Sequence, residues 1–139
     1  VLMFDRLEKA NAGQSFPLGE IMAAIPWGNT GLIAAVTQQY NTGEVLMLAW
    51  MSRQALEETI DTGFACYWSR SRQSLWRKGA TSGCRQKIHD IRLDCDGDAL
   101  LLLVDQAGGA CHTGRSSCFY NAIRGKEIVV LTNPGKPEK

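Results

Sequence analysis

The sequence has little that would direct it to a membrane or to a charged polymer. No apolar run approaches the roughly 20 residues that span a bilayer, and the longest candidate, 45-VLMLAWM-51, has the length of a strand. The first ten residues lack the basic start and apolar stretch of a signal peptide. Net charge is only +1, which gives no general reason to bind nucleic acid or lipid. We therefore expect a cytoplasmic protein.

Paired-cysteine motifs are also missing. The chain has five cysteines, an odd number that fits a complete disulfide framework poorly, and none of them forms a C-x-x-C motif. A zinc ribbon is thereby excluded. The absence of H-x-E and P-C-x-x-C argues against a zinc nucleobase deaminase. In a cytoplasmic protein the thiols are expected to be reduced, and clustered thiols then indicate metal binding or catalysis.

The chain contains no internal repeat and no low-complexity segment. Its 139 residues, 45% hydrophobic and 21% charged, predict one folded domain over 1–139 with a sizeable core. Residues 1–16 form a mixed N-terminal segment, in which a short helix is expected around Phe4–Ala10. The polar, proline- and glycine-containing tail 133–139 is expected to be flexible.

Short strands dominate the pattern from Gly31 onward. Residues 32–38 and 44–51 read as a hairpin around the turn 41-NTG-43. Further strands are expected at 65–69, 74–78, 86–95, 99–105 and 127–132, separated by glycine and serine. In 86–95 the alternation of polar and apolar residues is imperfect, so which face is buried stays open. A glycine-rich loop, 107-AGGACHTG-114, leads into 115-RSSCFYNAI-123.

One helix is clearly marked. Ser52 suits the N-cap, residues 53–62 place Ala55, Leu56, Thr59 and Ile60 on one face, and Gly63 suits the position after the C-cap. Together these elements predict an α+β fold, mainly antiparallel β, in which a curved sheet or partial barrel carries one clear helix near 53–62.

Three aspartates lie within five residues, in 94-DCDGD-98, directly before the apolar run 99-ALLLLV-104. In extended backbone Asp94, Asp96 and Asp98 would point to one side, and their repulsion calls for a raised pKa or a bound cation. Hard oxygen ligands suit Mg²⁺ or Ca²⁺. A solvated hairpin turn is an alternative, because Asp and Gly are common turn residues. An EF-hand is excluded, since Ala99 stands where that loop requires glycine.

Three of the cysteines, Cys95, Cys111 and Cys118, lie within 24 residues and are candidate zinc ligands. Three protein ligands leave a fourth position for water, the arrangement of a catalytic zinc site. The alternative is that they are small buried apolar side chains, as we expect for Cys66. In an extended strand Cys95 would face away from the aspartates. The thiol and the carboxylates could then not easily bind one ion within one subunit. Either two metals are bound, or Cys95 is a ligand to a metal in a neighbouring subunit.

The segment 67-YWSRSRQSLWRKGATSG-83 combines arginine, lysine and hydroxyl groups with two tryptophans. Arginine and hydroxyl groups suit phosphates, and aromatic faces suit bases. An exposed hairpin with core tryptophans is the alternative. Because the net charge is nearly zero, a small phosphorylated nucleotide fits better than a nucleic acid. His112 adjoins Cys111 and is a candidate for proton transfer, whereas His89 in a strand is expected to be structural.

Four segments in this order, WSRSRQSLWRKG, TSG, RLDCDGDALLLLV and ACHTGRSSCFY, resemble the phosphoribosyl-AMP cyclohydrolase family, which acts in the third step of histidine biosynthesis. The likeness runs from about Gly31 to Ile123. It implies an intertwined homodimer with active sites at the subunit interface. It also implies hydrolysis of the N1–C6 bond of the adenine ring in phosphoribosyl-AMP, with Zn²⁺ and Mg²⁺ required, to leave an imidazole carboxamide nucleotide. The chain stops soon after the last motif, so we expect the monofunctional form.

By motif, the resemblance implies roles for individual residues. Cys95, Cys111 and Cys118 would bind zinc, with Cys95 reaching the site of the partner chain, and Asp94, Asp96 and Asp98 would bind magnesium. His112 would transfer a proton or stabilise the tetrahedral oxygen. The substrate, with its two 5′-phosphates, would be bound by Trp68, Ser69, Arg70, Ser71, Arg72, Trp76, Lys78, Thr81, Ser82, Gly83, Thr113 and Arg115.

Three positions depart from the family pattern. Ala80 replaces the glutamate of GETSG, Cys84 stands where histidine or asparagine is common, and Ser116 replaces the second arginine of T-G-R-R-S-C. These changes are expected to weaken metal or phosphate binding and to reduce activity without removing any expected metal ligand. The non-enzymatic alternative is a zinc- and nucleotide-binding module, which would have four protein ligands and no open metal position.

Overall fold

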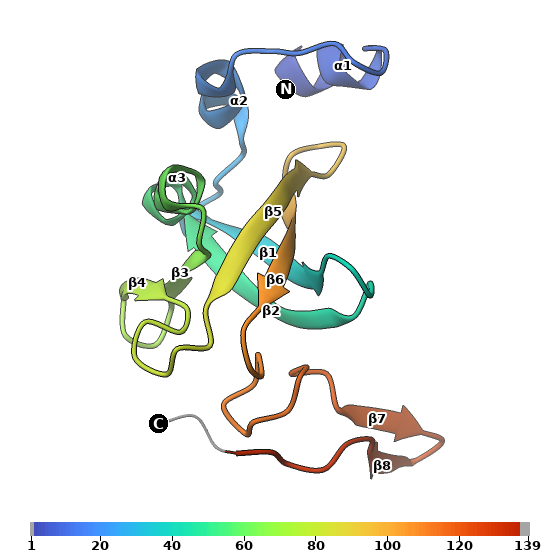
Figure 1. The fold of residues 1–139 in the computed structure, drawn as a ribbon. Helices are drawn as coiled ribbons and strands as arrows, with labels where there is room; N and C mark the ends of the chain where they lie inside the picture. Colours follow the sequence, from blue (N-terminus) through green and yellow to red (C-terminus); the bar gives the residue numbers. More distant parts are fainter. Residues whose placement is uncertain (1, 137–139) are drawn as a thin grey trace.

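The computed structural model describes residues 2–136, so the predicted flexibility of tail residues 137–139 lies outside the described part. A strongly curved six-stranded sheet forms a half-barrel, with a separate two-stranded sheet near the C-terminus (Figure 1). The helices are α1 (Leu2–Glu8), α2 (Leu18–Ala24) and α3 (Arg53–Thr62). The strands are β1 (Leu32–Gln39), β2 (Val45–Ser52), β3 (Cys66–Ser69), β4 (Ser74–Arg77), β5 (Gln86–Leu93), β6 (Ala99–Gln106), β7 (Asn121–Arg124) and β8 (Glu127–Val130).

The large sheet has the strand order β4-β3-β2-β1-β6-β5. The predicted β1–β2 hairpin is confirmed. The pairs β3–β4 and β5–β6, which the sequence offered only as alternatives, are also antiparallel hairpins. The β1–β6 pair, in contrast, is parallel, from Ala34 opposite Ala99 to Gln39 opposite Val104. Parallel pairing needs a long crossover, which here runs through β2, α3, β3, β4 and β5. The expected mainly antiparallel α+β fold is therefore confirmed, with one parallel pair that local patterns could not reveal.

A β-bulge explains the imperfect alternation in β5. The register shifts between Ile88 and Asp90, so that His89 is the extra residue. An extra residue moves the following side chains to the opposite face. Ile88 before the bulge, and Ile91 and Leu93 after it, all pack against the core. The exposed ring of His89 stacks on Tyr40 with the two ring centroids 3.7 Å apart, in agreement with a structural role.

Helix α3 has the predicted boundaries and caps. The Ser52 hydroxyl accepts a hydrogen bond of 3.1 Å from the amide of Ala55, as an N-cap side chain does. Gly63 adopts a left-handed conformation, φ 78°, and its amide donates to the carbonyl of Thr59. Ala55, Leu56 and Thr59 are buried as expected, whereas Ile60 at the edge of this face is 37% exposed.

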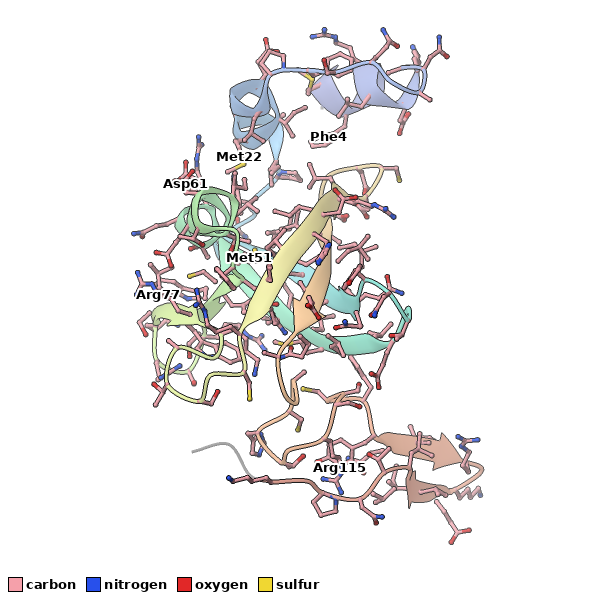
Figure 2. The ribbon with its side chains drawn as sticks, viewed as in Figure 1. Phe4, Met22, Met51, Asp61, Arg77 and Arg115 are labelled. Atoms are coloured by element: carbon pink, nitrogen blue, oxygen red, sulfur yellow. The ribbon has the colours of Figure 1, made fainter. Side chains whose placement is uncertain are left out.

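The N-terminal segment is more ordered than the sequence pattern indicated. Helix α1 confirms the expected short helix but begins earlier, and α2 was not predicted. Phe4 of α1 is 5% exposed and, like Met22 of α2 and Met51 of β2, belongs to the hydrophobic core (Figure 2). The described residues contain no helix that is both long and apolar enough to cross a membrane.

The C-terminal segment was only half predicted. The expected strand at 127–132 is β8, but its partner β7 lies in a stretch that showed no strand pattern. The β7–β8 hairpin projects away from the half-barrel (Figure 1). Its apolar side chains face outward: Ile123 is 76% exposed, Ile128 60% and Val130 56%.

A buried polar chain crosses the interior of the half-barrel. The Tyr67 hydroxyl lies 2.7 Å from the Thr37 hydroxyl and donates a hydrogen bond of 2.6 Å to Gln86 Oε1. Gln86 Nε2 donates to Gln106 Oε1 at 2.8 Å. Gln106 Nε2 in turn donates to the carbonyls of Cys84 and Ala107. The chain therefore ties the two loops that leave β4 and β6 to the core.

Candidate active site

The predicted site residues fall at opposite ends of the β5–β6 hairpin. Gln86, where β5 begins, pairs with Gln106, where β6 ends. The loop before β5 and the loop after β6 therefore share one end, and the turn 94–98 forms the other (Figure 1). Eight residues at about 3.3 Å each put roughly 25 Å between the two ends. Within one chain the aspartates are thus remote from Cys111, His112 and Cys118.

The aspartate turn, residues 94–98, brings its three carboxylates together. One oxygen each from Asp94, Asp96 and Asp98 lies within 4.8 Å of the others, and all three residues are exposed. The strand predicted to run to Cys95 ends at Leu93, so the convergence arises from a turn and not from alternation along extended backbone. Both readings of the sequence, hairpin turn and carboxylate cluster, therefore describe the same five residues. Such an oxygen cluster fits a hard divalent cation.

The carboxylates of the aspartate turn differ in acidity. Partial burial opposes ionisation of Asp94, but its pKa is lowered by hydrogen bonds from Asp98 and from the amide of Ala99. The Asp98 amide donates to Asp94 Oδ1 at 3.1 Å. The pKa of Asp98 is raised, because hydrogen bonding to Asp94 and Asp96 favours its protonated form and the charges of both residues repel its ionised form. Negative charge is thus concentrated where a cation would relieve it.

Glycine at position 97 shapes this turn. Gly97 has φ 72° and is buried, and a Cβ at that position would collide with the ring of Phe4 from α1. A side chain would therefore meet both backbone strain and steric overlap. Helix α1 consequently packs directly on the aspartate turn (Figure 2).

The cysteine loop, residues 107–118, carries two of the three predicted zinc ligands. Cys118 is anchored by its amide, which donates to the carbonyl of Leu46 at 2.7 Å. Burial raises the pKa of Cys111, but the net shift is downward because Thr113, the Cys118 side chain and Arg115 favour the thiolate. The Thr113 hydroxyl donates to Cys111 Sγ at 3.1 Å. A paired, thiolate-favouring arrangement fits a metal ligand set.

Cys95 does not join the other two thiols within one chain. It is exposed on the aspartate turn, at the far end of the β5–β6 hairpin. Among the described residues, the three aspartates form the one group of three or more candidate ligands close enough to hold an ion, and Cys95 is outside it. Three cysteine ligands on one ion therefore require Cys95 from a second copy of the chain.

Cys66 and Cys84 have different surroundings. Cys66 is 1% exposed, as expected for a buried apolar side chain. Its burial, together with the nearby Glu58 carboxylate, raises the pKa of the thiol to about 12. Cys84 is half-buried, and its Sγ lies so near Gly108 that a Cβ there would be 2.8 Å away. The Cys84 side chain therefore lies between the loop before β5 and the cysteine loop.

Five of the predicted substrate residues line one groove of about 480 Å³. We call it the tryptophan groove; its lining residues are Leu48, Ala49, Trp50, Trp68, Ser69, Arg70, Ser71 and Trp76. Trp50 was not predicted, because in the sequence it reads as a β2 core residue, yet the Arg70 guanidinium stands 5.0 Å from its ring centroid. Arginine against indole faces suits a nucleotide base with a nearby phosphate.

Lys78 joins this groove to the cysteine loop. The residue is only 4% exposed, and its ammonium donates a hydrogen bond of 2.7 Å to the carbonyl of Ala110, which precedes Cys111. The same ammonium lies 5.4 Å from the Trp76 ring centroid. Lys78 thereby links Trp76 of the groove to the loop that carries Cys111.

The remaining predicted substrate residues are more dispersed. Arg72 turns back to Ser69, whose hydroxyl accepts from its amide and from its Nε. Thr81, Ser82 and Gly83 form the turn between β4 and β5, where the Gly83 amide donates to Gly79. Arg115 is held by the C-terminal segment, since its Nε donates to the Thr132 carbonyl and its guanidinium stacks 3.8 Å from the Tyr120 ring centroid. His112 is exposed on the cysteine loop.

The three departures from the expected motifs are also placed. Ala80 lies in the turn after β4, at the end of β5 remote from the aspartate turn, so the missing carboxylate is not part of the acidic cluster. Cys84 begins the segment into β5. Ser116 donates a hydrogen bond of 2.9 Å from its hydroxyl to Glu44 Oε2. The Glu44 carboxylate therefore has a hydrogen-bond donor at position 116, although that donor is a serine and not an arginine.

The half-barrel thus carries an arginine-bearing aromatic groove that suits a nucleotide, together with two neighbouring thiols and a carboxylate turn that suit metal ions, as in a metal- and nucleotide-binding protein. The family model of phosphoribosyl-AMP cyclohydrolase matches residues 47–120, just over half of the chain. The chain belongs to this family.

Curated relatives of this family match the chain over nearly its full length. Phosphoribosyl-AMP cyclohydrolase 2 of Pseudomonas fluorescens is 59% identical over 133 residues, which is 96% of this chain and 90% of the relative. The phosphoribosyl-AMP cyclohydrolase of Alkalilimnicola ehrlichii is 58% identical, over 95% of this chain and 93% of the relative. The phosphoribosyl-AMP cyclohydrolase of Hydrogenovibrio crunogenus is 56% identical, over 96% of this chain and 90% of the relative.

Proposed function

We propose that this chain hydrolyses phosphoribosyl-AMP at the N1–C6 bond of its adenine ring, in the cytoplasm, as a step of histidine biosynthesis. Family membership supports the reaction. The observation that carries it in the structure is the contact from Lys78 to Ala110, which joins the tryptophan groove to the cysteine loop. A base held in the groove would thereby lie next to the thiols and His112.

Zinc is the metal that suits the cysteine loop. Cys111 and Cys118 of one chain, with the partner's Cys95, would hold Zn²⁺ and leave one position open. At such a position Zn²⁺ brings the pKa of a bound water near neutrality and so supplies a nucleophile. The support is the proximity of Cys111 and Cys118 and the lowered pKa of Cys111. The aspartate turn would hold Mg²⁺ through its three carboxylates.

The proposed homodimer follows from the division of the site. One chain presents Cys95 and the aspartates at one end of the β5–β6 hairpin and Cys111, His112 and Cys118 at the other. A second copy would bring the two halves together. The exposed apolar side chains of the β7–β8 hairpin, with Leu48 at 49% exposure, provide surface for such an assembly.

The chain's own residues would then bind, orient and transfer protons. Trp50, Trp68 and Trp76 would pack on the purine, and Arg70 would pair with a phosphate. His112, exposed on the cysteine loop, would move the proton of the attacking water or stabilise oxygen charge at C6. As the tetrahedral carbon collapses, N1, which carries the second ribose, leaves and a carboxamide forms at C6.

A direct assay tests this function. Purified protein with Zn²⁺ and Mg²⁺ is incubated with phosphoribosyl-AMP, and ring opening is followed by ultraviolet absorbance and by product mass. We expect a product heavier by one water, and loss of turnover by at least about a hundredfold in Cys118→Ala. A folded, zinc-loaded dimer without turnover would refute the reaction and favour a non-catalytic nucleotide-binding relative.

A further inference from the structure

A second cavity of about 480 Å³ lies beside α3 and the β3–β4 hairpin. We call it the cationic pocket; its lining residues are Glu58, Thr62, Phe64, Ala65, Arg77, Lys78, Ala80 and Arg85. Three of the eight are cationic and one is anionic, so the lining carries a net charge of +2 (three minus one). On a chain with a net charge of +1, this concentration of positive charge favours an anionic ligand.

Both arginines of the cationic pocket are held in place by neighbours. Arg77 donates to Glu58 twice, from Nε at 2.7 Å and from an Nη at 2.8 Å. The guanidinium of Arg85 stacks on Phe64, 3.6 Å from the ring centroid. Stacking occupies the face of a guanidinium and leaves its N–H edge for a planar or tetrahedral oxyanion. The pocket is therefore organised before a ligand arrives (Figure 2 shows Arg77 on β4).

The cationic pocket adjoins the proposed reaction site through Lys78. This residue lines the pocket, its ammonium bonds to Ala110 beside Cys111, and it lies 5.4 Å from the ring of Trp76 in the tryptophan groove. Trp76 lines one cavity and Lys78 the other, so the two cavities adjoin through this pair of residues. A ligand with two phosphates, one on each side of a base, needs two anion sites separated in this way.

We propose that the cationic pocket binds one of the two 5′-phosphates of the substrate, with Arg85 and Arg77 as specificity-determining residues. This inference rests on the proposed function. Arg70 in the tryptophan groove would serve the other phosphate. Ala80 adds no charge to the lining. This differs from the loss of phosphate binding expected from the sequence, because a glutamate at this position would place a second carboxylate among the arginines and lower the net charge of the pocket.

The test compares Arg85→Met with the matched control Arg53→Met. Arg53 also pairs with a glutamate, Glu57 at 3.4 Å, but lies on α3 outside the cationic pocket. Binding of ribose 5-phosphate, a single phosphate monoester, is measured by titration calorimetry. We expect the affinity to fall by at least about tenfold in Arg85→Met and in Arg77→Met, and to stay unchanged in Arg53→Met. Arg85→Lys keeps the positive charge but loses the paired N–H donors of the guanidinium, so its affinity for ribose 5-phosphate should lie between those of wild type and Arg85→Met.

Kinetics separate binding from chemistry. Arg85→Met should raise KM for phosphoribosyl-AMP by at least about tenfold while kcat stays within about twofold. Unchanged ribose 5-phosphate binding, or a fall in kcat at constant KM, would overturn the proposal. Equal binding of sulfate with no change in KM would show a general anion site and overturn the assignment to substrate. Arg85-dependent ribose 5-phosphate binding in a wild-type protein without turnover would refute the reaction and retain the phosphate site.

Discussion

The ammonium of Lys78, directly after β4, donates a hydrogen bond of 2.7 Å to the carbonyl of Ala110, which lies 32 residues later in the sequence. This contact joins the segment that lines both cavities to the loop of Cys111. Replacing Lys78 by methionine removes a buried donor, at a cost of about 1–3 kcal/mol of stability. We expect kcat/KM to fall at least about tenfold and Tm to decrease, measured by steady-state kinetics and calorimetry.

The control for this change is Lys87→Met, on the exposed side of β5. Both substitutions remove one positive charge, so a general electrostatic effect would appear in both. Equal kcat/KM values for the two variants would show that the Lys78 contact does not position the cysteine loop.

Mixing two inactive variants tests whether the metal site is shared. Cys95→Ala and Cys118→Ala should each abolish turnover. In a heterodimer of the two, one site lacks both ligands and the other has all three, so co-expression should restore about a quarter of the wild-type activity if chains pair at random. Activity that stays at the level of the single variants would place all three ligands within one chain.

Asp98→Asn should change stability in opposite directions with and without metal. In EDTA the variant should have the higher Tm, because the substitution relieves repulsion from Asp94 and Asp96 that raises the pKa of Asp98. With Mg²⁺ the order should reverse, since a lost carboxylate weakens affinity by about tenfold or more. Thermal scans at several Mg²⁺ concentrations measure this, and a parallel shift at all concentrations would argue against a cation site.

Tyr67→Phe should weaken the interior of the half-barrel. The substitution removes the hydroxyl between Thr37 and Gln86 and leaves both without that partner, which costs about 1–3 kcal/mol in urea unfolding. Tyr40→Phe is the control, because Tyr40 is 45% exposed and keeps its ring stack with His89. A Tyr67→Phe variant as stable as wild type would show that the buried polar chain adds nothing to stability.

The buried thiol of Cys66 predicts a loss of stability at alkaline pH. Its pKa is about 12 in the folded protein, above the usual value of 9.0, so the unfolded chain releases this proton first. The contribution is complete below pH 9 and decreases as pH rises toward 12, by about 1 kcal/mol between pH 9 and pH 10. Cys66→Ala should therefore show a shallower decline in unfolding free energy over this range. An identical pH slope in the variant would contradict the burial effect.

Local patterns in the sequence were sufficient for the elements whose causes are local. Helix α3 was predicted to the residue, because its caps at Ser52 and Gly63 act within one turn. Helix α2 and strand β7 were missed for the converse reason. The α2 N-cap is Pro17, which makes no side-chain cap hydrogen bond, and β7 is four residues long with the mixed composition Asn-Ala-Ile-Arg.

The sequence by itself determined the chemistry of this protein: three carboxylates, thiols with a histidine, and arginine among tryptophans, in an order specific to one family. Tertiary structure alone decided where these groups lie. The parallel β1–β6 pair and the β5 bulge depend on contacts between distant residues, and the β5–β6 hairpin separates Cys95 from Cys111 by its length. The cationic pocket is likewise invisible in the sequence, because Phe64, Arg77 and Arg85 meet only when strands from different parts of the chain pack together.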